Sequence, residues 1–133
     1  MAVTLNDKVR ALVDGRNYAV LATVNPDGAP QTSPMWIDRD GDDVLFCTVA
    51  GRRKDLNLRR DPRVSITVFD LRDPENYAEI RGTATITEQD AFAFDDKLSW
   101  KYDGKPKDPD PEGFVRVIVR VTPTRVTGYA VDR

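Results

Sequence analysis

The sequence FCTVAGRRKDLNLRRDPR, residues 46–63, is the stretch from which the rest of the chain is best interpreted. Its first residues are apolar and β-prone, which predicts a strand ending near Val49. Gly51 tolerates backbone angles that other residues resist, so a tight turn follows. A short helix comes next and must end near Asp61, because Pro62 disfavours helical geometry in the residue before it. The stretch therefore predicts a strand, a glycine turn and a helix.

Three cations, Arg-Arg-Lys at residues 52–54, stand at the start of this predicted helix. They are unfavourable there by roughly 0.3–1 kcal/mol each, because a helix N-terminus already carries partial positive charge. The same position is a strong site for a phosphate or a carboxylate. Thr48, at the strand end, can donate its hydroxyl to the same anion. A solvated basic helix is the alternative, although Arg59 and Arg60 already supply the cations that a helix C-terminus favours.

Length and composition narrow the class of protein. A chain of 133 residues predicts one domain, residues 1–133. The net charge of −2 argues against bulk electrostatic binding to nucleic acid. The single cysteine, Cys47, excludes an intrachain disulfide and fits a buried structural thiol. No segment resembles a membrane span or a signal peptide, so we expect no membrane partner and a cytoplasmic location.

The chain has no histidine. A Ser-His-Asp or Cys-His mechanism is therefore excluded, and so is a histidine-based metal site. If the protein is an enzyme, carboxylates or a bound cofactor must carry the chemistry.

Hydrophobic periodicity and turn residues predict short strands in hairpin series, with helices between them. The predicted strands are residues 17–24, 30–38, 43–49, 64–69, 77–87, 114–121 and 124–131. The predicted helices begin at Thr4, after Gly51 and at Glu88. The strand at 17–24 is apolar on both faces, so we expect both faces to be buried. Six to seven antiparallel strands with two to three helices indicate a mainly β fold, a β-barrel with flanking helices.

The chain resembles the pyridoxamine-phosphate-oxidase-like, FMN-binding split β-barrels. In that family a strand ending in Thr is followed by a glycine turn, an Arg-Lys pair and a short helix, and the next strand opens Pro-Arg-Val. Here these are Thr48, Gly51, residues 53–54 and residues 62–64. The run at residues 57–63 is most similar to the branch of F420-dependent enzymes. The resemblance extends from about Val3 to Tyr129.

The resemblance implies a split β-barrel homodimer with the cofactor at the subunit interface. The residues that it assigns to cofactor binding are Thr32, Ser33, Pro34, Met35, Trp36, Thr48, Gly51, Arg52, Arg53, Lys54, Asn57 and Tyr77, the last from the second subunit. No catalytic side chain and no metal ligand is implied. Trp36 fits simple barrel packing equally well, and Tyr77 could be a loop anchor. Ile37 stands where the founding oxidase has a cofactor-contacting lysine, and its C-terminal Arg and His signature is missing, so oxidation of pyridoxamine phosphate is not expected.

The resemblance leaves three functions open. The first is an F420-dependent oxidoreductase that transfers hydride between reduced deazaflavin and a small organic substrate. Its phosphate and polyglutamate tail would use residues 52–54, with Arg59 or Arg60. The alternatives are an FMN-dependent reductase or oxidase and a non-catalytic flavin- or F420-binding protein. Nucleic-acid binding ranks last, because no aromatic stacking platform accompanies the cations.

Overall fold

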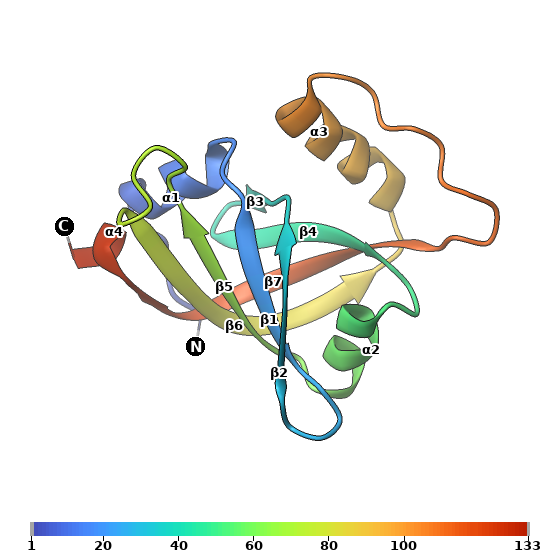
Figure 1. Cartoon of the computed structure of the whole chain (residues 1–133), viewed down its shortest axis with the longest axis horizontal. Helices are drawn as coiled ribbons and strands as arrows, with labels where there is room; N and C mark the ends of the chain where they lie inside the picture. Colours follow the sequence, from blue (N-terminus) through green and yellow to red (C-terminus); the bar gives the residue numbers. More distant parts are fainter. Residues whose placement is uncertain (1, 133) are drawn as a thin grey trace.

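One antiparallel sheet of seven strands, flanked by four helices, forms the computed structural model, which describes residues 2–132 (Figure 1). The elements in chain order are α1 (Asp7–Asp14), β1 (Ala19–Val24), β2 (Pro30–Met35), β3 (Asp38–Asp40), β4 (Asp43–Val49), α2 (Arg53–Arg60), β5 (Arg63–Phe69), β6 (Tyr77–Thr87), α3 (Ala91–Asp103), β7 (Arg116–Thr127) and α4 (Tyr129–Asp132). The predicted mainly β class is confirmed. The helices of residues 2–132 are too short and too polar to include a membrane-spanning segment.

The sheet curls because its two edges are joined by a very short piece of chain. The strand order is β2-β1-β5-β6-β7-β4-β3, so β2 and β3 lie at opposite edges. Only Trp36 and Ile37 separate them in sequence. A chain spans at most roughly 3.6 Å per residue, so the two edges must approach each other. The result is a split β-barrel. The single strand predicted over residues 30–38 is therefore wrong, since the link at Trp36 and Ile37 divides it between the two edges.

Two apolar cores share β4. Val44 and Phe46 point into the barrel, whose interior also contains residues from α1, β1, β5 and β6. Leu45 and Cys47 point the other way, toward α3. The residues of this second core are Leu45, Cys47, Ala91, Leu98 and Ile118, with Trp36, Phe94 and Tyr102 packed against them. The helical spacing of Ala91, Phe94, Leu98 and Tyr102 predicts one apolar face for α3, and this face holds the helix against the outside of the barrel (Figure 1).

The outer face of β1 is partly uncovered in the single chain. Ala19 and Leu21 are buried, as predicted. Tyr18 and Val20, on the opposite face, are 46% and 37% exposed. The prediction that both faces are buried is wrong for the single chain, because the ring of Tyr102 in α3 covers part of Tyr18 and leaves the rest of this face open to solvent.

The ends of several elements differ from the predicted ones. Helix α1 begins at Asp7 rather than Thr4, because the side chain of Asn6 accepts the N–H of Val9 at 2.9 Å and caps it. Helix α3 begins at Ala91, after Asp90 in a left-handed conformation with no side-chain cap. The two last predicted strands are one strand, β7, and the short helix α4 replaces the predicted strand end. The alternation of Val115 with Val117 and Val119 predicts that Val115 points inward, but this residue precedes β7 and is 42% exposed.

A glycine inside a strand predicts a bulge or a close backbone approach, and the pairing of β6 with β7 does change register between Arg81 and Gly82. A Cβ atom at Gly82 would lie 2.2 Å from the carbonyl oxygen of Thr122. Backbone cannot move away as a flexible side chain can, so only glycine allows this approach.

We expect Gly82→Ala to destabilise the protein by about 1–3 kcal/mol, because the added methyl group must displace the β7 backbone. Urea unfolding followed by circular dichroism measures the effect. Thr83→Ala, at the exposed neighbouring residue, is the control and should change the midpoint far less. Equal midpoints for the two variants would contradict the steric explanation.

Candidate functional site

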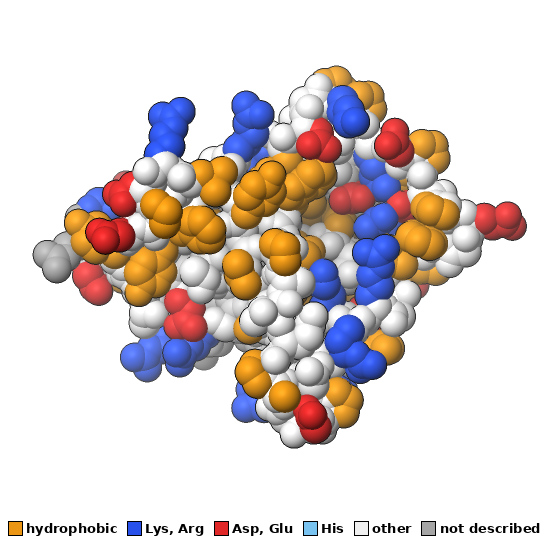
Figure 2. Space-filling view, in the orientation of Figure 1, with side chains coloured by type: hydrophobic (Ala, Val, Ile, Leu, Met, Phe, Trp, Pro, Cys, Tyr) orange, Lys and Arg blue, Asp and Glu red, His pale blue; other side chains and the backbone are white. Residues whose placement is uncertain are grey.

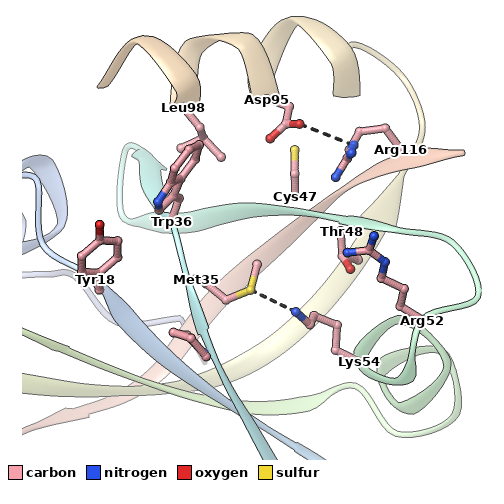
Figure 3. A pocket seen from close by; sticks show the side chains of 11 residues that line it. Tyr18, Met35, Trp36, Cys47, Thr48, Arg52, Lys54, Asp95, Leu98 and Arg116 are labelled. Carbon is pink, nitrogen blue, oxygen red and sulfur yellow. Dashed lines mark hydrogen bonds and ion pairs between the residues drawn. The ribbon is translucent and has the colours of Figure 1, made fainter. Parts of the chain in front are cut away.

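A cavity of about 360 Å³ lies between the end of β2, β4, the start of α2, and α3. Figure 2 shows Lys and Arg side chains gathered in the hollow between α3 and α2, and Figure 3 shows the lining side chains. The lining residues are Tyr18, Pro34, Met35, Trp36, Cys47, Thr48, Arg52, Lys54, Asp95, Leu98 and Arg116. Six of them were assigned to cofactor binding by the resemblance: Pro34, Met35, Trp36, Thr48, Arg52 and Lys54. These six come from two stretches of the sequence, residues 34–36 and residues 48–54.

The glycine turn delivers two cations to one end of this cavity. Gly51 has a positive φ of 94°, as the turn requires. Its N–H donates to the carboxylate of buried Asp55 at 2.8 Å, and that carboxylate also accepts from Arg59 Nε at 2.8 Å. The N–H of Gly51 is therefore already bound to the carboxylate of Asp55. An anionic ligand would instead be bound by the side chains of Arg52 and Lys54.

Lys54 is half-buried and lacks a carboxylate partner. Its Nζ donates to Met35 Sδ at 3.2 Å, a weak acceptor. Burial, and then the charge of Arg52, lower the pKa of Lys54. Within residues 2–132, no ion pair forms to Arg52, Arg53 or Lys54. An unpaired, half-buried ammonium group is unfavourable unless an anion joins it.

The hydroxyl of Thr48 faces the same cavity. Thr48 is 3% exposed, and its Oγ1 makes no hydrogen bond to any described residue. Leaving a buried hydroxyl unsatisfied costs roughly 1–3 kcal/mol. Such a group calls for a specific explanation, and a ligand oxygen supplies one. Ser33 Oγ is also buried and unpaired, but Ser33 does not line this cavity.

A compensated group of charges forms the wall of the cavity under α3. Arg116 lies 2.6 Å from Asp110 and 3.4 Å from Asp95, and Lys107 lies 2.7 Å and 3.3 Å from the same two carboxylates. The hydrogen bond from Arg116 lowers the pKa of Asp110 to about 2. Two positive and two negative groups thus balance one another. They tie residues 104–113 to α3 and β7, so Arg116 contributes less free charge to the cavity than Lys54 does.

The opposite end of the cavity is aromatic. Trp36 and Tyr18 lie across from Arg52 and Lys54 (Figure 3). The ring of Tyr102 stacks on both, with centroids 5.2 Å from Trp36 and 5.9 Å from Tyr18. Between the two ends, burial raises the pKa of Cys47 to about 12, so this thiol stays protonated and is a poor nucleophile.

The other residues assigned by the resemblance lie off this cavity. Asn57 is fully buried and donates to Thr23 Oγ1 and Asn25 Oδ1, both at 3.0 Å, which fastens α2 to β1. Arg53 lines a separate cavity beside the β1–β2 turn, and Tyr77 lines another one near α4. The remaining assigned residues off this cavity are Thr32, Ser33 and Gly51.

The two cations at the end of α2, Arg59 and Arg60, already bind groups within the protein. Arg59 pairs with Asp55, and Arg60 donates to Asn57 Oδ1 and to the carbonyl of Val24. Their position makes them weaker candidates for a ligand's tail than Arg52 and Arg53.

Sequence reasoning missed five lining residues: Tyr18, Cys47, Asp95, Leu98 and Arg116. Tyr18 and Leu98 fit ordinary strand and helix patterns. Asp95 and Arg116 are far apart in sequence. The alternation of charged and apolar residues around Arg116 places it on the outer face of β7, but no local signal reveals that α3 covers that face.

Several solved structures have a similar fold over most of the length of this chain. An F420 reductase is 35% identical, with a TM-score of 0.83, covering 92% of this chain and 98% of that one. A conserved hypothetical protein from Mycobacterium tuberculosis is 28% identical, with a TM-score of 0.76, covering 94% and 84%. A pyridoxamine 5'-phosphate oxidase-related, FMN binding protein from Nostoc punctiforme is 22% identical, with a TM-score of 0.63, covering 90% and 76%. The last similarity concerns the fold alone.

The family model described as pyridoxamine 5'-phosphate oxidase matches residues 5–129. The match includes every strand of the sheet and every residue that lines the cavity. The chain therefore belongs to the pyridoxamine 5'-phosphate oxidase family.

Proposed function

We propose that this protein is an F420-dependent oxidoreductase that transfers hydride between reduced deazaflavin and a small organic substrate. The observation that carries the proposal is the unsatisfied hydroxyl of Thr48 in the same cavity as Arg52 and Lys54. These three groups have the chemistry that a phosphate oxygen needs: one hydroxyl donor and two cations that form no ion pair with any described residue. The apolar side chains of the cavity suit a flat ring beside that phosphate.

The chain's own residues bind and orient in this proposal. A bound deazaflavin or flavin supplies the hydride chemistry, so no acid–base pair is needed from the protein. Lys54 and Arg52 hold the anionic group at one end. Pro34, Met35 and Trp36 keep water away from the ring. The protonated thiol of Cys47 takes no part as a nucleophile.

The F420 reductase with 35% identity supports F420 over FMN. The positions of the cations support it as well. Arg52 and Lys54 are enough for one phosphate, and Arg53 points away from that cavity toward the β1–β2 turn. F420 extends beyond its phosphate with carboxylates, which Arg53 would meet. FMN has no such tail. An FMN-dependent reductase and a non-catalytic cofactor carrier remain the alternatives, supported by family membership.

We also propose that the active form is a homodimer with the cofactor at its interface. A cavity of about 360 Å³ is at the small end for a ligand site, and a second chain would enlarge it. The exposed side chains of Tyr18 and Val20, beside that cavity, provide an apolar surface for such a contact. Tyr77, remote from the cavity of its own chain, is a candidate for the site of the partner.

Titrations of the purified protein with F420 and with FMN test the cofactor. We expect F420 to bind more tightly at low ionic strength, with the difference narrowing as salt is added, because exposed tail contacts are each worth only about 0–1 kcal/mol and are screened. Arg53→Ala should narrow the difference too, with FMN affinity nearly unchanged. The cofactor would be assigned as FMN instead if the denatured protein released stoichiometric FMN, or if F420 and FMN bound with equal affinity at low salt.

Lys54→Ala should weaken binding of either cofactor by roughly tenfold to a hundredfold, since a charge-assisted bond worth about 1.5–3 kcal/mol is lost. Isothermal titration calorimetry measures the change. Lys8→Ala, at an exposed lysine of α1, is the matched control and should bind like the parent. Loss of the same size in both variants would argue against a specific anion site at Lys54.

Light scattering at micromolar concentration should give the mass of two chains. Val20→Glu places a charge on the exposed face of β1 and should shift the mass toward one chain without unfolding the barrel, because Val20 already contacts solvent. Ala11→Glu, at an exposed position of α1, should leave the mass unchanged. A parent protein with the mass of one chain would refute the homodimer.

A further inference from the structure

The aromatic end of the cavity depends on a residue that does not line it. Trp36 and Tyr18 line the cavity, whereas Tyr102 of α3 lies behind them. Its ring is parallel to the indole of Trp36, with an interplanar angle of 0°, and inclined by 26° to the ring of Tyr18. One phenol therefore supports two lining rings at once.

The hydroxyl of Tyr102 binds the backbone next to both of those rings. It donates to the carbonyl of Asn17 at 2.7 Å, the residue before Tyr18. It accepts the N–H of Ile37 at 3.2 Å, the residue after Trp36. Burial raises the pKa of Tyr102 to about 12, so the hydroxyl keeps the proton that it donates near neutral pH.

The neighbouring lysine reinforces the same link. Lys101 Nζ donates to the carbonyl of Ile37 at 2.7 Å and to the carbonyl of Val13 at 2.6 Å. Trp36 and Ile37 lie outside β2 and β3, so ladder pairing does not fix their backbone. The end of α3 supplies the hydrogen bonds that strand pairing would otherwise provide.

We propose that Tyr102 is a positioning residue, which fixes the planes of Trp36 and Tyr18 so that this end of the cavity stacks a flat conjugated ring. The proposal rests on the proposed function, in which the ring of the cofactor lies beside Trp36. Tyr102 acts through the two lining residues and not by contact with the ligand. A residue of this kind should change affinity for the ring and leave affinity for the phosphate nearly unchanged.

The test separates the two ends of the cavity with two probes. Riboflavin has the flat ring without the phosphate, and inorganic phosphate has the anion without the ring. Trp100→Phe removes the exposed second tryptophan, so that emission reports on Trp36 alone. All variants are made in this background, in the full-length chain. Tyr102→Leu removes ring and hydroxyl, Tyr102→Phe removes the hydroxyl only, and Phe94→Leu trims another aromatic residue that packs α3 onto the second core.

We expect riboflavin to quench Trp36 in the parent. Tyr102→Leu should raise the riboflavin Kd by roughly threefold to tenfold, as loss of an aromatic contact implies. Its phosphate Kd, measured by calorimetry, should stay within about twofold of the parent. Tyr102→Phe should shift Trp36 emission, because it frees the peptide of Ile37, and should raise the riboflavin Kd less. Phe94→Leu should change neither Kd by more than about twofold.

Three results would overturn the assignment of Tyr102. The first is that the parent does not bind riboflavin. The second is that Tyr102→Leu and the parent have equal riboflavin Kd values. The third is that Tyr102→Leu and Phe94→Leu lose the same amount of riboflavin affinity. A parent that binds riboflavin through Trp36 but binds F420 and FMN no more tightly than riboflavin would refute the proposed function. The comparison of Tyr102→Leu with Phe94→Leu would still decide the role of Tyr102.

Discussion

The link of two residues between β2 and β3 is the constraint on which the rest of the structure depends. Because Trp36 and Ile37 alone connect opposite edges of the sheet, a flat sheet is impossible and the barrel must curl. Ile37 turns its side chain into the core, where it is 1% exposed. Trp36 turns toward the cavity. The same step in the chain thus shapes the barrel and builds one wall of the candidate site.

The balance of charges distinguishes the two sides of that site. Under α3, Arg116 and Lys107 meet two aspartates, which compensate them. At the start of α2, Lys54 donates to the thioether of Met35 and, within residues 2–132, forms no ion pair. Native proteins pair half-buried charges wherever stability alone decides, because desolvation is unfavourable. The uncompensated side is therefore the one that we propose binds an anion.

Local patterns predicted the elements that local chemistry determines. Pro62 ended α2, Gly51 made the turn, and the periodicity of α3 located its buried face. The same patterns failed where distant segments decide the outcome. The division between β2 and β3 follows from sheet order, and the hydrogen bonds of buried Asn57 to Thr23 and Asn25 are not indicated by its place in a motif. The cationic half of the site was therefore visible in the sequence, whereas the wall formed by α3 was not.

The sharing of β4 between two cores has a consequence for how the molecule opens. Of the described residues, eighteen form the buried cluster inside the barrel and five form the buried cluster beneath α3. Local openings follow the amount of apolar surface that they expose. Detachment of α3 breaks only the smaller cluster, so its amides should exchange with solvent through a partial opening that leaves the barrel intact. Those of β4, held from both sides, should exchange only when the whole domain unfolds. The helix that forms one wall of the cavity is thus held by the smaller of the two buried clusters.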